Sequence, residues 1–236
     1  MHTLGKIRQA LLDDLSRIES DTQFTTTYLN ARINESIQFM ANLHDWQETQ
    51  GSLKHGIKVG RDYVFYPENL RTDSVKIIKI LDEEYDLVLF REFERHRDNN
   101  PNSTLKIATD YERKLFVHTT PTVTHPTGAK IWGNIVPPDT TNDNKLHVFA
   151  YQSVLEQAIF KYAQGSCLMK ERGSYLSKGE KMQENAIAAA NAEWKKQREK
   201  QAEYKTQDTV MFDHLNLIDE GQNGVAPFSQ GNFNNC

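Results

Sequence analysis

The chain has 236 residues, of which 38% are apolar and 25% charged, and its formal net charge is −4. This is the composition of an ordinary globular protein, with enough sequence for one good core or two small ones. No stretch approaches the roughly 18 to 20 consecutive apolar residues that a bilayer-spanning helix needs, which excludes a membrane-spanning protein.

The charge is unevenly distributed along the chain. Residues 206–236 contain four acidic and no basic side chains, so the preceding part is neutral. A neutral body without a basic stripe argues against sequence-specific DNA binding, which rests on clustered Lys and Arg. The first residues are followed by Asp13 and Asp14 in place of an apolar run, so we expect no secretory signal and a protein used inside a cell. Cys167 and Cys236 lack the spacing of a zinc site or disulfide framework, and we expect free thiols.

Apolar residues recur at helical spacing in the first fifty residues. They are Leu4, Ile7, Leu11, Leu15 and Ile18 in a first run, and Leu29, Ile33, Ile37, Met40 and Leu43 in a second. Each run places its apolar side chains on one face of a helix, and the hydroxyls of Thr25, Thr26 and Thr27 offer N-caps for the second helix. We therefore predict an N-terminal helical hairpin over residues 1–50.

Residues 51–140 change to short β-branched and aromatic runs separated by Gly, Pro and polar loops. The predicted strands are Tyr63–Tyr66, Val75–Ile80, Leu105–Ala108, Leu115–His118 and Ala129–Ile135. Residues 91–98 are charged and are predicted to form one or two helical turns. Because the connections look too short for parallel crossovers, we predict a small antiparallel β unit inserted into a helical protein.

Helical spacing returns in residues 141–206, which are predicted to complete the bundle. One buried helix is expected over 145–163, ending near Gly165, and a longer one over 177–204 with a narrow apolar seam. The Gly, Asn and Gln content of residues 207–236 predicts an extended C-terminal arm. The predicted fold class is therefore α+β and mainly helical: a helical bundle with an inserted small antiparallel β unit, a long C-terminal helix and an extended arm.

No catalytic, cofactor-binding or metal-binding residue is predicted. The sequence contains no GxGxxG, GxxxxGK[ST], HExxH, GxSxG or EF-hand pattern, and its eight histidines include no i, i+4 pair on a predicted helix. One alternative stays open: the carboxylates of Asp82, Glu83, Glu84 and Asp86 could hold Mg²⁺ for a nuclease or packaging factor acting on DNA. The simpler interpretation of this cluster is a solvated acidic turn between strands.

Apolar residues in polar surroundings are the candidates for binding other proteins. Trp194 lies in a helix otherwise rich in charge, where it either packs on the body or contacts a partner. The arm carries dispersed aromatic and aliphatic residues and is expected to order against a partner, because a few aromatic anchors usually dominate such contacts. The predicted partner-binding residues are Trp194, Phe212, Leu215, Leu217, Phe228 and Phe233.

Several short motifs occur in an order that resembles one known family, the tailed-phage head-to-tail adaptor (connector or neck ring) proteins. The motifs are Arg32-Ile33-Asn34-Glu35, His44-Asp45-Trp46, Pro67–Arg71 before a strand pair, Leu115–Val117 with Pro121, Ile131-Trp132 before Pro137-Pro138, and two closing helices. The resemblance covers about residues 20–205. The β region has longer polar loops than the family pattern, which leaves its strand count open.

The resemblance implies a structural virion protein that forms a twelvefold homo-oligomeric ring in the neck, after assembly in the host cytoplasm. Such a subunit would bind the portal protein on one side and tail or other neck proteins on the other, while DNA passes through the lumen without specific binding. Besides the metal-dependent nuclease, a third hypothesis is a host regulatory protein that binds partners through its long helix and forms a discrete small complex.

Overall fold

The computed structural model of the chain describes residues 3–16, 22–171 and 173–219. Residues 1–191 form one compact unit and residues 192–236 a second. Unit 1 contains helices α1 (Leu4–Asp14), α2 (Thr26–Leu43), α3 (Phe90–Asn99) and α4 (Ser153–Glu171), a short 3-10 turn η1 (Gln47–Thr49) and all the strands. Helix α5 (Ser174–Asp219) begins in unit 1 and continues into unit 2.

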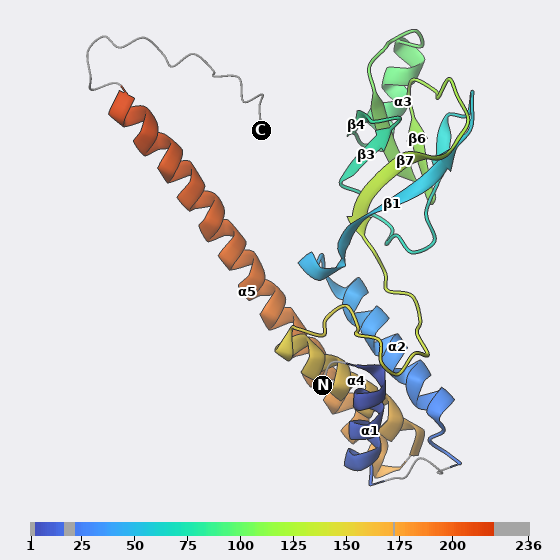
Figure 1. Cartoon of the computed structure of the whole chain (residues 1–236), viewed down its shortest axis with the longest axis vertical. Coiled ribbons are helices and arrows are strands. Elements are labelled where there is room, and N and C mark those ends of the chain that lie inside the picture. The colour runs from blue at the N-terminus through green and yellow to red at the C-terminus, as the bar shows by residue number, and fades with distance from the viewer. Residues whose placement is uncertain (1–2, 17–21, 172, 220–236) are drawn as a thin grey trace, which may run out of the picture. The chain divides into compact units, whose positions relative to one another are not determined.

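Seven strands form one mixed sheet that is nearly closed into a barrel (Figure 1). They are β1 (Gln50–Ile57), β2 (Tyr63–Phe65), β3 (Ile77–Ile80), β4 (Glu83–Leu87), β5 (Ile107–Tyr111), β6 (Lys114–Val117) and β7 (His125–Asn134). Their spatial order is β1-β7-β3-β4-β5-β6-β2, and the two end strands, β1 and β2, contact each other. The alternation of buried and partly buried residues along β6 and the second half of β7 places one face of each strand inside the barrel.

The barrel corrects the predicted fold class. The protein is α+β with 46% helix and 22% strand, and a seven-stranded barrel-like sheet replaces the small β unit within a mainly helical bundle. Strand β4 was expected to be an acidic turn, and β1 was not predicted as a strand. The sheet is also not purely antiparallel, because β4 and β5 pair in parallel through a crossover that contains α3. A ten-residue helix is therefore long enough to serve as the parallel connection.

The barrel interior is a continuous apolar core. Every strand contributes buried residues to it, and β1 does so through Ile57 at its end. Partly buried Leu53, Val75 and Leu87 pack against this core. The central residues are Val64, Ile78, Ile80, Ala108, Leu115, Val117, Ala129 and Ile131. Burial of this set makes the barrel a folding core in its own right.

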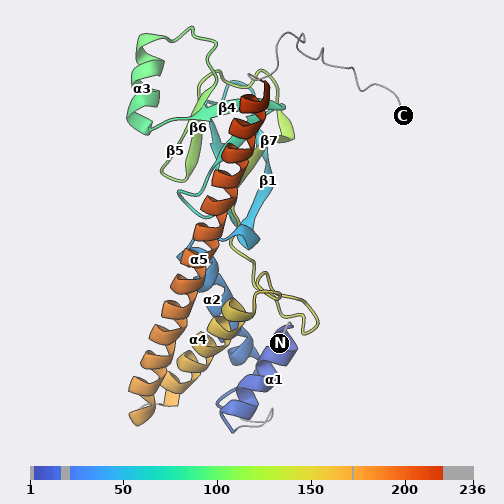
Figure 2. The same ribbon diagram turned by 90° about the vertical axis from the view of Figure 1, so that its left-hand side faces the viewer.

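A second core lies between the helices of unit 1. Helix α2 packs on α4, and α1 contacts both (Figure 2). Helices α1 and α2 lie within the region predicted as a helical hairpin, and α2 packs on the following helix, α4. Thr25 is the N-cap of α2, accepting a hydrogen bond from the backbone N–H of Tyr28 at 3.3 Å. Helix α4, however, spans Ser153–Glu171 and passes through Gly165, where the sequence predicted an end.

Helix α5 also extends further than predicted. It continues to Asp219, so the segment expected to be an extended arm from residue 207 begins as helix. Residues 220–236 lie outside the described residues. No helix in the described parts of the chain is both long enough and apolar enough to span a membrane.

Candidate partner-binding site

The junction between α2 and the barrel is fixed by residues from the short family-like motifs. Trp46 is fully buried, and its indole N–H donates to the Met40 carbonyl oxygen at 2.6 Å. The Asp45 carboxylate accepts hydrogen bonds from the Arg71 guanidinium and, at 2.7 Å, from the Asn134 side-chain amide. These contacts join the end of α2 to the loop before β3 and to the end of β7. The Asp-Trp motif is therefore a structural joint between the two cores.

The segment 135–152, which connects β7 to α4, is attached to α1 and α2 by paired polar contacts. The Asn34 side chain donates to the Thr140 carbonyl oxygen at 2.9 Å and accepts from the Thr140 N–H at 3.3 Å. The Arg8 guanidinium donates to both Asp143 carboxylate oxygens, at 2.6 and 2.7 Å. This bidentate contact holds the pKa of Asp143 below its ordinary value. Both contacts hold the segment in a fixed course across the helices.

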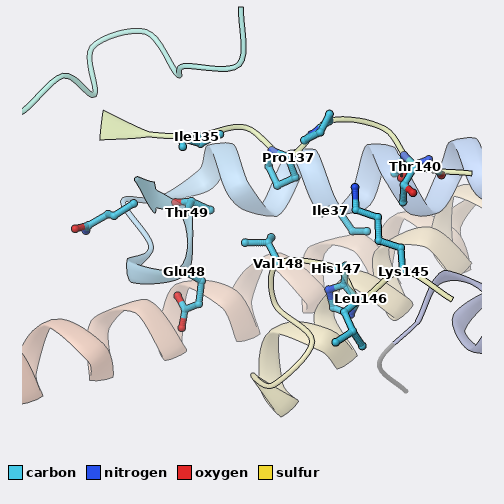
Figure 3. Close-up of a pocket in the computed structure, with 13 residues that line it drawn as sticks. Ile37, Glu48, Thr49, Ile135, Pro137, Thr140, Lys145, Leu146, His147 and Val148 are labelled. Atoms are coloured by element: carbon cyan, nitrogen blue, oxygen red, sulfur yellow. Dashed lines mark hydrogen bonds between the residues drawn. The ribbon is translucent and has the colours of Figure 1, made fainter. Parts of the chain in front are cut away.

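A pocket of about 340 Å³ lies between this segment, α2 and η1 (Figure 3). Its walls are mostly apolar. They are formed by Ile37, Ile135, Pro137, Pro138, Leu146 and Val148, with Asn34, Glu48, Thr49, Gln50, Thr140, Lys145 and His147 completing the lining. The volume lies at the small end of the roughly 300 to 1,000 Å³ typical of ligand pockets. It is sufficient for one or two apolar side chains from another protein.

The electrostatics of the pocket favour an apolar occupant. Its charged lining residues, Glu48 and Lys145, have opposite signs, and the Glu48 carboxylate accepts a hydrogen bond from the Gln152 side-chain amide at 2.6 Å. Leu146 of the pocket lining is exposed, and beyond the pocket on the same segment Tyr151 is 81% exposed. Such neighbouring exposed apolar groups are typical of protein-binding surfaces.

This pocket was not predicted because residues 145–152 were assigned to a helix. In the structure Leu146 forms an isolated β-bridge with Thr3, and burial alternates from exposed Leu146 through buried His147 and partly buried Val148 to buried Phe149. Residues 148–151 then form a turn, so this stretch is not helical. The one signal in the sequence was Pro137-Pro138, since two prolines prevent helix and strand from continuing across the pocket wall.

Helix α5 contains a second set of candidate positions, which we call the apolar stripe. Trp194 and Phe212 are eighteen residues apart, which is five turns of an α-helix, so both positions lie on the same face. The position of Leu215 is close to that of Phe212 on the same face, three residues further on. The position of Leu217 lies on the other side of the helix. Leu217 is therefore separated from Trp194, Phe212 and Leu215, although all four were predicted to bind partners.

The structure thus groups three of the predicted partner-binding residues and separates a fourth. Trp194 is partly exposed in unit 2, with the Arg198 guanidinium 5.0 Å from its ring centroid. Phe228 and Phe233 lie outside the described residues. Tyr204, Met211 and Ile218, which the prediction omitted, occupy positions on the face that includes Leu215.

The acidic cluster of the nuclease hypothesis lies on the β3–β4 hairpin. Glu83 forms an ion pair with Lys106 at 2.6 Å, and Glu84 forms one with Lys79 at 3.1 Å. Asp82 and Asp86 are exposed. Within residues 3–16, 22–171 and 173–219, no group of three or more His, Cys, Asp or Glu side chains has a geometry that could hold a metal ion.

Comparisons with known proteins add no family to this description. No protein-family model matches the chain, and no curated protein matches it significantly.

Proposed function

We propose that this protein is a structural subunit of a head-to-tail adaptor ring in a tailed-phage virion, located between the portal and the tail. The observation that carries the proposal is that helical spacing places positions 194, 212 and 215 on one face of α5. The order of short motifs along residues 20–205 supplies the family context.

Apolar residues on one face of a long helix suit an assembling protein. In unit 1, Ala186 and Ala190 of α5 are buried. In unit 2, positions 194, 212 and 215 fall on one face of the helix, and such a face is a common means by which a helix binds another protein. In the proposed ring, this face binds the portal protein.

The other features fit the same role. The apolar pocket beside α2 is suited to receive a side chain from a tail or neck protein. The neutral body suits a subunit that surrounds a DNA channel without binding the phosphates, because clustered cations would hold the DNA. The subunit then works by association and carries no reaction of its own.

The test is reconstitution of the purified full chain with the portal of the same virion. We expect a ring of subunits on one face of the portal, visible by cryo-electron microscopy, with helix α5 in contact with the portal. A discrete small complex with a host protein would favour the regulatory hypothesis. Failure to form any stable complex with the portal would contradict the proposal.

A further inference from the structure

A basic and aromatic groove lies at the seam of the barrel, where the two ends of the sheet meet. It has a volume of about 490 Å³, and β1 and β2 form its two sides. It is lined by His55, Gly56, Ile57, Lys58, Arg61, Tyr63, Phe65, Thr124, His125 and Pro126. Every charged side chain in this lining is basic. The groove therefore favours an occupant that carries negative charge.

Aromatic rings extend this groove onto the outer face of the barrel. Phe65 is 49% exposed, and its ring lies edge-on to Tyr63 with centroids 5.2 Å apart. The Arg61 guanidinium lies over both rings, 5.2 Å from the Tyr63 centroid and 5.9 Å from that of Phe65. Beside the groove, Val59 is 59% exposed. The surface thus offers cations next to apolar area, which suits an occupant with both a carboxylate and an apolar side chain.

The same barrel presents a surface of the opposite character at the β3–β4 hairpin. The two turn residues, Leu81 and Asp82, have φ of 51° and 66°. Positive φ at both positions is the geometry of the two-residue hairpin turn that normally takes Asn-Gly. Leu81 is nevertheless 39% exposed at the tip. Asp82 beside it is exposed, and so is Asp86 further along β4. A bulky apolar residue in this conformation is unfavourable both for the backbone and for hydration.

We propose that the groove binds the β3–β4 hairpin of a second copy of this chain. Leu81 of one subunit packs on Phe65 and Val59 of the next, while Asp82 and Asp86 face Lys58 and Arg61. The charges are complementary, and each surface has exposed apolar side chains to bury. This inference rests on the ring that the proposed function contains, and it identifies the surfaces through which neighbours meet.

The strand pairing places the two surfaces at the same end of the barrel. The Leu81 N–H donates to the Gly128 carbonyl oxygen of β7 at 2.8 Å, and β7 pairs with β1, whose last residues line the groove. The hairpin turn and the groove are nevertheless different surfaces of one subunit. A contact between two different surfaces is heterologous, and a series of such contacts closes into a ring when the rotation between neighbours allows it.

The experiment measures self-association of the purified full chain, without portal, by sedimentation equilibrium. A groove variant carries Lys58→Glu and Arg61→Glu, a hairpin variant carries Asp82→Lys and Asp86→Lys, and a fourth chain carries all four changes. We expect the association constant of the wild type to fall with salt. The association constant of each double variant should be at least about tenfold lower than that of the wild type. The chain with all four changes should recover to within about threefold of the wild type.

Leu81→Asn tests the apolar part separately from the charges. Asn tolerates positive φ better than Leu, so this chain should fold at least as well while its association weakens. Lys161→Glu, on the exposed surface of α4, is the matched control and should associate as the wild type does. Circular dichroism melting checks that each variant is folded.

The inference is overturned if the wild-type chain stays monomeric up to about 1 mM. It is also overturned if the charge reversals leave the association constant unchanged, or if the chain with all four changes does not regain association. Portal binding is measured separately, so the two proposals can fail independently. Self-association through this contact without any portal binding would remove the phage role and leave the interface. Portal binding with no effect of the reversals on self-association would remove the interface alone.

Discussion

Gly165 of α4 and Gly179 of α5 contact each other through their backbones. A Cβ atom added to Gly165 would lie 2.7 Å from the Gly179 carbonyl oxygen, and one added to Gly179 would lie 2.6 Å from the Gly165 carbonyl oxygen. Both distances are shorter than real Cβ contacts, and the atom met is backbone, which cannot rotate away. The two helices therefore cross at a distance that only glycine allows.

We predict that Gly165→Ala and Gly179→Ala each destabilise the protein by about 1 to 3 kcal/mol, the usual cost of overpacking a close contact. The sign is informative, because Ala in a helix interior is otherwise favoured over Gly by about 1 kcal/mol. Urea unfolding measures the difference. Gln157→Ala, at an exposed position of α4, should change the free energy of unfolding by less than about 0.5 kcal/mol. Stabilisation by either glycine change would show that the helices do not cross here.

The helical core makes the second prediction. Ile33 in α2 and Leu155 in α4 are both 0% exposed, and α2 packs on α4. Ile33→Asp or Leu155→Asp should unfold the chain, since a buried unpaired charge costs several kcal/mol against a total stability of about 5 to 15 kcal/mol. Ile77→Asp, at an exposed strand position, is the control. A wild-type melting temperature in either core variant would refute this core.

The Arg8–Asp143 contact should make stability depend on pH. Because Arg8 lowers the folded-state pKa of Asp143 below its ordinary value of 3.8, the contact stabilises the protein above that value. The stabilisation is lost as the pH falls through the lower, folded-state pKa. Urea unfolding of wild type and Asp143→Asn should therefore differ by a constant amount from about pH 7 to 5, and the difference should shrink towards pH 3. A difference independent of pH would mean that the Asp143 charge contributes nothing.

Cys167 should be inert to thiol reagents in the folded protein. It is 0% exposed, and burial raises the pKa of its thiol to about 11. The thiolate, which is the reactive form, is therefore both rare and shielded at pH 8. A Cys236→Ser chain isolates Cys167, and we expect its labelling to be at least about a hundredfold slower in buffer than in urea. Rapid labelling of the native chain would show that the helical core opens readily.

Local patterns in the sequence were sufficient to predict the elements that depend on local physics. The helices α2 and α3 and the strands β2, β3, β6 and β7 coincide with predicted runs, because their apolar periodicity and turn residues are local. Gly165 was misinterpreted as a helix end. A glycine inside a helix has the same local signature whether it ends the helix or admits a neighbour, and only the position of Gly179 distinguishes the two.

The barrel could not be predicted for a related reason. Strand β4 has two glutamates and an aspartate among its five residues, and only Tyr85 is buried, with Leu87 partly buried against the core. Its strand character therefore depends on pairing with β3 and β5. The parallel pairing of β4 and β5 is a long-range choice that α3 makes possible. The pocket depends likewise on Asn34 and Arg8 meeting Thr140 and Asp143, contacts between residues more than one hundred positions apart.

The last prediction concerns the C-terminal segment, where helix geometry refines the choice of residues. The positions of Phe212 and Leu215 share one face of α5 with Trp194, and Leu217 lies on the other side. If this face binds the portal, the effect of a substitution should follow the face and not merely the position along the chain.

Truncation after Thr206 should leave unit 1 folded and reduce portal affinity by well over tenfold, because it removes most of the apolar stripe.

In the full chain, Phe212→Ser with Leu215→Ser should weaken portal binding by about tenfold or more, whereas Leu217→Ser should change it by less than about threefold. The three substitutions have similar helix propensities, so differences in affinity report the contact surface. Surface plasmon resonance with immobilised portal gives the dissociation constants, and circular dichroism confirms that the helix is retained. Equal losses from both faces would mean that the segment binds in a conformation other than this helix, and an unchanged affinity after truncation would remove the segment from the portal contact altogether.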